Sequence, residues 1–186
     1  MGHAVIQARF YLALLPAFLA FAPALQAHQL DEYLQATLVT LEPDRARFQI
    51  NLTPGVAVAE SVVALVDRDR DGVISTNEAA AYAELLRRDL TVQLDQHKLD
   101  LKLTACNLPP VSELRSGWGI IQMEFSASLA SLAAGTHRVT LKNRHLPRIS
   151  VYLINAAKPE SPAVHIASQK RNKNQSVGEI EFTLNP

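Results

Sequence analysis

The sequence contains a single cysteine among 186 residues, so it cannot form an intramolecular disulfide, and disulfide-stabilised scaffolds are excluded. Its formal net charge at pH 7 is zero, which argues against nucleic acid as a partner because nucleic-acid-binding proteins usually carry a basic surface. Beyond residue 27 no apolar stretch is long enough to span a bilayer. Cys106 lies in a strand-like run, and we expect it to be a small buried side chain rather than a reactive thiol.

The first 27 residues have the three parts of a secretory signal peptide: a basic start with Arg9, an apolar centre over residues 10–21, and Ala27 at the cut. The apolar run is short and interrupted by Pro16, which favours cleavage over the alternative of an uncleaved membrane anchor. The remaining chain has 17 basic and 18 acidic residues. We therefore expect a soluble protein that is periplasmic or secreted.

Short runs with alternating apolar and polar residues dominate the rest of the sequence, and this period of two is typical of half-buried strands. The runs cover residues 28–41, 46–52, 90–94, 99–103, 118–128, 137–143, 149–155, 164–168 and 177–184. The first two predict one hairpin and the next two a second. The pattern predicts an antiparallel β-sandwich of eight or nine strands, forming one domain over residues 28–186. A helical insertion at about residues 56–89 should pack on an edge or end of the sandwich.

An acidic segment, residues 67–78, divides this insertion. Carboxylates occupy its first, third, fifth and twelfth positions, and a glycine occupies the sixth. This is the spacing of an EF-hand calcium loop, in which a short flexible segment supplies the six to eight oxygens that calcium requires. The carboxylates, one backbone carbonyl and one hydroxyl would be the ligands of a Ca²⁺ ion. These ligands are Asp67, Asp69, Asp71, the carbonyl of Val73, the hydroxyl of Ser75 and the bidentate Glu78.

The residues on both sides of the loop support this interpretation. Apolar residues at helical spacing between Val58 and Val66 predict an entering helix, and residues 78–88 predict an exiting one. Ser75 and Glu78 have the spacing of a capping box that opens the second helix. The alternative is a solvated acidic loop that binds nothing. We favour calcium binding because every loop position that requires a particular residue type has one, and the segments on both sides are predicted to be helical.

The other residues give little evidence of a catalytic site or of a second metal site. After cleavage His28 would be the N-terminal residue, and its amine and imidazole together are typical copper ligands, although an exposed terminal histidine is the simpler interpretation. The remaining histidines lack the spacing of a metal site, and we expect them in surface turns or strands; they are His97, His137, His145 and His165. We find no nucleophile motif and no acid–base pair. We therefore expect no enzymatic activity, and no small-molecule substrate is evident.

Beyond the loop, which resembles the EF-hand superfamily, the whole mature chain resembles a second family. The segments that carry this resemblance are residues 28–35, 52–56, 136–137, 143, 151–156, 169–172 and 175–176. They are similar to the exported N-terminal domain of bacterial nickel/cobalt-transporter-like and urease/hydrogenase-accessory-like membrane proteins. The sequence ends at Pro186 without a membrane helix, so we do not expect transport. The resemblance implies at most an accessory of such a system.

These observations predict an exported, non-enzymatic protein with one calcium ion, whose role is structural. A calcium-triggered switch is less favoured, because such switches expose a methionine-rich groove and Met123 is the only methionine after Met1. The second interpretation is a periplasmic interaction module that serves a membrane protein for nickel or cobalt transport. An enzyme with an unrecognised site is the third.

Overall fold

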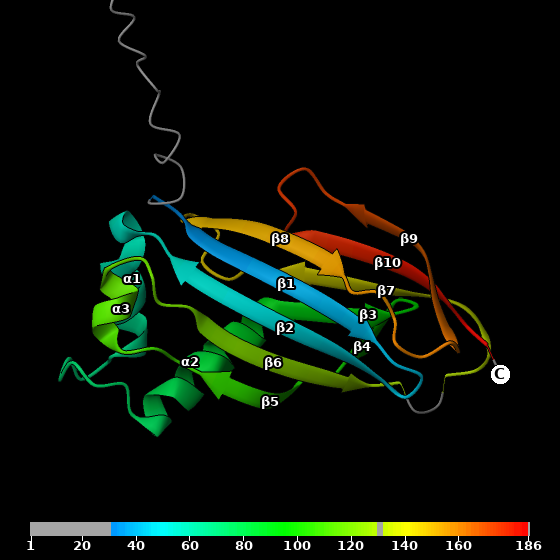
Figure 1. The fold of residues 1–186 in the computed structure, drawn as a ribbon, viewed down its shortest axis with the longest axis horizontal. Coiled ribbons are helices and arrows are strands. Elements are labelled where there is room, and N and C mark those ends of the chain that lie inside the picture. Colours follow the sequence, from blue (N-terminus) through cyan, green and yellow to red (C-terminus); the bar gives the residue numbers. More distant parts are fainter. Residues whose placement is uncertain (1–30, 130–131, 186) are drawn as a thin grey trace, which may run out of the picture.

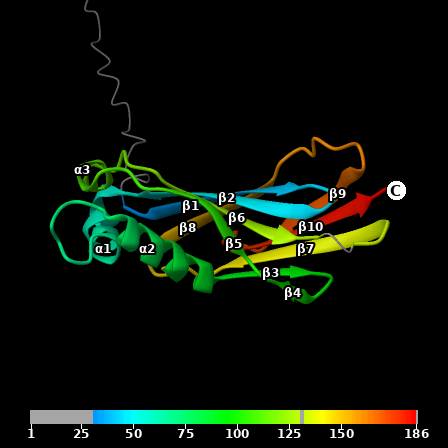
Figure 2. The same ribbon diagram turned by 90° about the horizontal axis from the view of Figure 1, so that it is seen from below.

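The computed structural model describes residues 31–129 and 132–185, which form two five-stranded β-sheets packed face to face. Three helices lie together at one end of the two sheets (Figures 1 and 2). The prediction of a mainly β protein with two packed sheets is confirmed. Residues 1–27, the predicted signal peptide, and His28 lie outside the described residues.

The first sheet has the strand order β5-β6-β2-β1-β8. Its strands are β5 (Lys102–Asn107), β6 (Ile121–Ser128), β2 (Arg45–Pro54), β1 (Tyr33–Leu41) and β8 (Ser150–Ala156). β1 and β2 form the predicted first hairpin, with Tyr33 opposite Pro54. β1 and β8 run parallel, unlike the other pairs, because the chain crosses the molecule before it enters β8. The sheet is therefore mixed rather than purely antiparallel.

The second sheet has the order β4-β3-β7-β10-β9, and all its neighbouring strands are antiparallel. Its strands are β4 (His97–Leu99), β3 (Leu90–Leu94), β7 (Gly135–Asn143), β10 (Val177–Leu184) and β9 (Val164–Arg171). β10 shows the alternation most clearly, because Ile180, Phe182 and Leu184 are buried while the residues between them are half-exposed. Such alternation buries one face of a strand and leaves the other in water.

The inward-facing side chains of both sheets form the hydrophobic core. Phe48 and Phe125, which are opposite each other on β2 and β6, are fully buried, as are Leu141 and Phe182 of the second sheet. Polar side chains also join the sheets at one edge. The side-chain amide of Gln169 on β9 donates to the carbonyl of Ile154 at 2.8 Å and accepts from the amide of Ala156 at 3.1 Å. Gln169 thus satisfies backbone groups on the edge strand β8.

The helices are α1 (Val56–Val66), α2 (Thr76–Asp89) and the short α3 (Val111–Arg115), which falls in a segment predicted to be a loop. α1 buries Val58, Val62 and Val66 against the core. α2 buries Tyr82 and Leu86 on one face, while Arg87 and Arg88 in its last turn lie near the negative end of the helix dipole. Both helices therefore form where their sequence patterns predict them.

The second predicted hairpin forms between β3 and β4, but β4 covers residues 97–99 and not the predicted 99–103. The pairing of these strands ends at Leu99, and the chain then crosses to the first sheet, where Leu103 and Cys106 pair with β6. β5 is an edge strand whose residues are all exposed, so the prediction that Cys106 is buried is wrong. Partial desolvation still raises the pKa of the Cys106 thiol, which disfavours the reactive thiolate.

No helix within the described residues is both long and apolar enough to cross a membrane.

Gly178 on β10 provides a test of how closely the two sheets pack. A Cβ atom at this position would lie 2.6 Å from Cγ2 of Ile154 on β8, in the opposite sheet. We expect Gly178→Ala to lower the free energy of unfolding by about 1–3 kcal/mol, because the added methyl group overpacks the core. Chemical denaturation of the variant measures this loss. Glu179→Ala, at the half-exposed neighbouring position, is the matched control, and equal stability of the two variants would contradict this packing.

Candidate metal centre

The candidate metal centre is the loop between α1 and α2, at the helical end of the molecule (Figures 1 and 2). α1 ends at Val66, and the amide of Asp67 caps it by donating to the carbonyl of Val63 at 2.8 Å. α2 begins after Ser75, which has an extended backbone. The loop is therefore held at both ends by helices.

Three of the predicted ligands lie together. Asp67, Asp69 and Asp71 each have a carboxylate oxygen within 4.8 Å of the other two. Asp67 is 2% exposed, whereas Asp69 and Asp71 are exposed. Three acidic groups at this spacing repel one another strongly when they are ionised, and a cation between them would remove the repulsion.

Backbone amides of the loop orient the three carboxylates. The amide of Gly72 donates to Oδ2 of Asp67 at 3.1 Å, and the amide of Asp71 donates to Oδ1 of Asp69 at 3.2 Å. The amide of Val73 donates to Oδ1 of Asp71 at 2.8 Å. Each aspartate thus uses one oxygen to shape the loop and has a second oxygen available to a ligand.

The second oxygen of Asp67 is the least satisfied polar atom of the loop. Oδ1 of Asp67 is buried and has no hydrogen-bond partner among the described residues. A buried carboxylate oxygen without a partner costs several kcal/mol in the usual case, so a cation would compensate it well. The unpartnered atom and the clustered carboxylates together make this loop a candidate cation site.

The backbone of the loop explains its glycine. Gly72 has φ +84°, in the left-handed region that side chains disfavour, although a Cβ atom at this position would meet no other atom within 4 Å. Conformation rather than crowding therefore favours glycine here. Arg70 also has a positive φ, of 63°. Arg68 and Arg70, the two basic residues of the loop, are exposed.

Glu78 is not among the clustered carboxylates. Its Oε1 accepts from the amides of Arg68 at 2.7 Å and Asp69 at 3.4 Å, while Oε2 accepts from the amide of Ser75 at 2.9 Å and its hydroxyl at 2.7 Å. These contacts, led by the hydroxyl of Ser75, lower the pKa of Glu78 to about 2. The side chain is thus ionised at neutral pH and already reaches over the loop.

The last two predicted ligands have different roles in this geometry. Ser75 is the N-cap of α2 and forms the predicted capping box with Glu78, so its hydroxyl is already hydrogen-bonded. The side chain of Val73 is 65% exposed, as expected if this residue contributes through its backbone. The structure therefore brings together three of the six predicted ligands and places Glu78 and Ser75 beside them in a hydrogen-bonded pair.

Two depressions flank the loop. One is lined by Asp67, Asp71 and Gly72 together with Glu60 and Arg115, which form an ion pair at 2.7 Å between α1 and α3. The other is lined by a different set of residues, among them Asp69, Ser75 and Glu78. Five of the six predicted ligands therefore line one or other of these depressions, and Val73 lines neither.

Sequence reasoning missed a buried hydrogen-bond network next to this centre. His145, expected at the surface, is fully buried, so that prediction is wrong. Its Nδ1 lies 2.7 Å from Oδ2 of Asp89, and its Nε2 lies 3.0 Å from the hydroxyl of Tyr82. The Tyr82 hydroxyl in turn lies 2.6 Å from that of Tyr33 on β1. Asp89 and Tyr82 both belong to α2, so the network joins this helix to both sheets.

No local signal marks His145 as buried, because its partners are distant in the sequence. The other three histidines agree better with the prediction: His97 and His165 are exposed. His137 is half-buried and binds Asp95 at 2.6 Å, which raises the pKa of its imidazole. The burial of His145 depends on its contact with Asp89, which nothing in the local sequence indicates.

A scan against protein-family models finds no match for this chain, and a search of curated proteins finds none either. Neither comparison assigns the chain to a family.

The His145 network predicts a pH dependence of stability. Burial lowers the pKa of His145 despite the opposing effect of Asp89, so the folded protein favours neutral imidazole. Neutral His145 makes its full contribution to the free energy of unfolding above the unfolded-state pKa of about 6.5, and this contribution is lost as the pH falls below that value. From pH 7.5 to 5.5 we expect a loss of up to about 1.4 kcal/mol in the free energy of unfolding.

Urea denaturation of the metal-free protein at several pH values measures this loss. His145→Gln should remove that part of the pH dependence, whereas His165→Gln, at an exposed position on β9, should keep it. His137 titrates with the opposite sign, because its raised pKa stabilises the fold at low pH, and it is the same in all three proteins. An unchanged pH profile in His145→Gln would contradict the buried neutral imidazole.

Proposed function

We propose that this protein is an exported calcium-binding protein in which residues 67–78 form a single EF-hand loop. The observation that carries the proposal is the buried, unpartnered Oδ1 of Asp67 beside the carboxylates of Asp69 and Asp71. A helix on each side and a capping box at the start of α2 are the context that such a loop requires.

The donor chemistry favours calcium over other cations. The clustered side chains offer carboxylate oxygens, which suit hard cations, and the cluster contains no imidazole or thiolate of the kind that zinc and copper prefer. Glu78 would complete the shell by exchanging its hydrogen bonds to the loop for two contacts with the ion. A bidentate carboxylate favours calcium over the smaller magnesium ion. Affinity of the extracellular type, on the order of 10⁻⁴ to 10⁻³ M, is sufficient outside the cytoplasm.

The ion would have a structural role. Asp67 follows the last residue of α1 and Glu78 lies in the first turn of α2, so an ion bound by both would link the two helices. α1 and α2 each pack on the sandwich, and the link would therefore strengthen the helical end of the molecule. At a calcium concentration 100 times Kd, binding adds about 2.7 kcal/mol to the free energy of unfolding.

Isothermal titration with CaCl₂ tests the proposal. We expect one site per chain and a rise in melting temperature with calcium. Glu78→Gln and Asp67→Asn should abolish both effects, because each removes a charged ligand. Asp100→Asn is the matched control, since it removes one exposed carboxylate outside the loop and should bind like the wild type. Absence of heat and of any thermal shift in the wild type would defeat the assignment.

A second candidate function, an interaction module for a membrane protein of a nickel/cobalt-type transport system, is favoured by an apolar surface on the first sheet. Two side chains of β1 and two of β8 on its outer face are each 38–41% exposed: Leu34, Leu38, Val151 and Leu153. Leu34 and Val151 are direct partners in the parallel pair. The neighbouring strand β2 instead exposes Gln49 and Asn51 on this face. Clustered exposed apolar side chains mark interaction surfaces.

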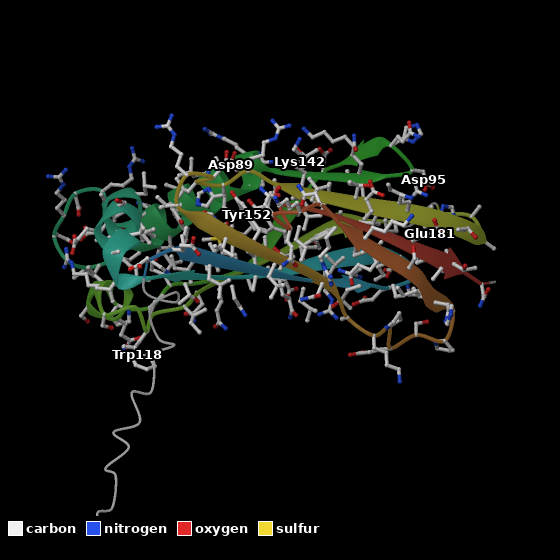
Figure 3. All side chains as sticks on the ribbon, turned by 90° about the horizontal axis from the view of Figure 1, so that it is seen from above. Asp89, Asp95, Trp118, Lys142, Tyr152 and Glu181 are labelled. Carbon is white, nitrogen blue, oxygen red and sulfur yellow. The ribbon has the colours of Figure 1, made fainter. Side chains whose placement is uncertain are left out.

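Trp118 adds an aromatic side chain to the same side of the molecule. It is 85% exposed and projects away from the body beyond the first sheet (Figure 3). It is also the only tryptophan in the sequence, so its fluorescence reports on this region without interference.

Photocrosslinking at Leu153 in detergent-solubilised membranes tests the second candidate. We expect a crosslink to a membrane protein of the transporter class, identified by mass spectrometry, and its loss in Leu38→Lys. Thr140→Lys, on β7 of the other sheet, is the control and should leave the crosslink intact. A shift of Trp118 emission to shorter wavelength on addition of the purified partner would agree with docking. Recovery of no membrane protein would contradict the module.

A further inference from the structure

Helix α2 carries both a predicted ligand of the metal loop and the partners of the buried histidine. Glu78 lies in its first turn, Tyr82 four residues later, and Asp89 at its last position. Spacings of four and seven residues return to nearly the same face of a helix, so the three side chains form one stripe about 16 Å long. A helix moves as a unit over this length, and a displacement at Asp89 or Tyr82 therefore displaces Glu78.

The position of His145 is fixed by contacts with both sheets. Its carbonyl accepts hydrogen bonds from the side-chain amide of Gln35 on β1 and the hydroxyl of Tyr152 on β8, both at 2.9 Å. Its amide donates to Oδ1 of Asn143, at the end of β7, at 2.9 Å. The imidazole is thus held by the sandwich, and α2 is held by the imidazole.

The hydrogen-bond pattern requires one tautomer of neutral His145. The carboxylate of Asp89 accepts only, so Nδ1 of His145 carries the proton and donates to it. Nε2 then accepts from the hydroxyl of Tyr82, whose oxygen accepts from the hydroxyl of Tyr33. A second proton, on Nε2, would turn this nitrogen into a donor, so the hydroxyl of Tyr82 would have to rotate toward Tyr33 and the direction of the chain would reverse, which leaves the hydroxyl proton of Tyr33 to find a new acceptor.

With α2 in its observed position, the side chain of Glu78 already forms hydrogen bonds to the loop. Its Oε1 lies 2.7 Å from the amide of Arg68 and its Oε2 lies 2.9 Å from that of Ser75, so a small side-chain movement brings it to an ion held by the three aspartates. A ligand that is positioned before binding loses less entropy on binding. The present position of α2 therefore favours binding, and a loosened α2 would weaken it.

We propose that His145 positions α2, and with it Glu78, so that the loop binds its cation more tightly when the imidazole of His145 is neutral. This inference rests on the proposed calcium site and adds a pH control to it. The groups that face the imidazole are Asp89 and Tyr82 from α2 and Tyr33 from β1, with Tyr152 of β8 on the His145 carbonyl. Burial raises the pKa of all three tyrosines, so these groups stay neutral over the pH range of interest.

Calcium titrations at pH 7.5 and 5.5 test the inference in the wild type and three variants. For the wild type we expect Kd to rise by roughly fivefold or more at pH 5.5, within the usual range of coupling between two sites. His145→Gln keeps a donor and an acceptor but does not titrate, so it should bind like the wild type at pH 7.5 and lose most of the difference in Kd between the two pH values. His145→Ala should bind weakly at both pH values, and His165→Gln should match the wild type.

A measurement on the wild type alone covers the case in which a variant does not fold. If neutral His145 strengthens calcium binding, reciprocity requires calcium to raise the acid dissociation constant of His145 by the same factor, which lowers its pKa. NMR titration of the histidine ring protons, with and without saturating calcium, measures this shift directly. The expected result is a lower pKa for His145 with calcium than without it.

The outcomes separate the two proposals. Calcium binding with the same pH dependence in the wild type and His145→Gln, and an unchanged pKa of His145, would overturn the role of His145 and leave the calcium site intact. Absence of calcium binding in the wild type at both pH values would overturn both proposals.

Discussion

Repulsion among three closely spaced carboxylates is the constraint on which the helical end of this molecule depends. Asp67, directly after α1, is buried, and the chain turns through Arg70 so that the carboxylates of Asp69 and Asp71 lie beside it. Backbone amides of the loop satisfy one oxygen of each aspartate, yet Oδ1 of Asp67 is left without a partner among the described residues. A calcium ion, as proposed, would neutralise the charges, occupy the unpartnered oxygen and join α1 to α2.

Helix α2 relates this loop to the rest of the fold. Its first turn is fixed by the capping box of Ser75 and Glu78, and its middle and end are fixed by His145. His145 is in turn held by side chains from both sheets, so the loop is connected to the core by hydrogen bonds rather than by apolar packing alone. Buried polar networks of this kind specify one arrangement because any shift leaves a donor or an acceptor unpaired.

Patterns that are local in the sequence predicted much of the structure. Both helices, the capping box, the first hairpin and the strands β6 to β10 follow from spacing within a few residues, as does the grouping of Asp67, Asp69 and Asp71. Contacts between distant residues were not predictable. Gln35 and His145 are 110 positions apart, and the crossing of the chain after Leu99, which exposes Cys106, depends on which sheet accepts β5. The sequence also contains no sign that β8 pairs with β1 in parallel.

The proposed calcium site depends both on an acidic pattern that is local in the sequence and on a helix, α2, that is positioned by contacts between distant residues. A crystal structure of the protein grown with millimolar CaCl₂, with anomalous scattering to identify the ion, tests this most directly. We expect one calcium ion at about 2.3–2.6 Å from Oδ1 of Asp67, with both oxygens of Glu78 turned toward it. A loop without an ion, in which Glu78 keeps its hydrogen bonds to Arg68 and Ser75, would contradict this expectation.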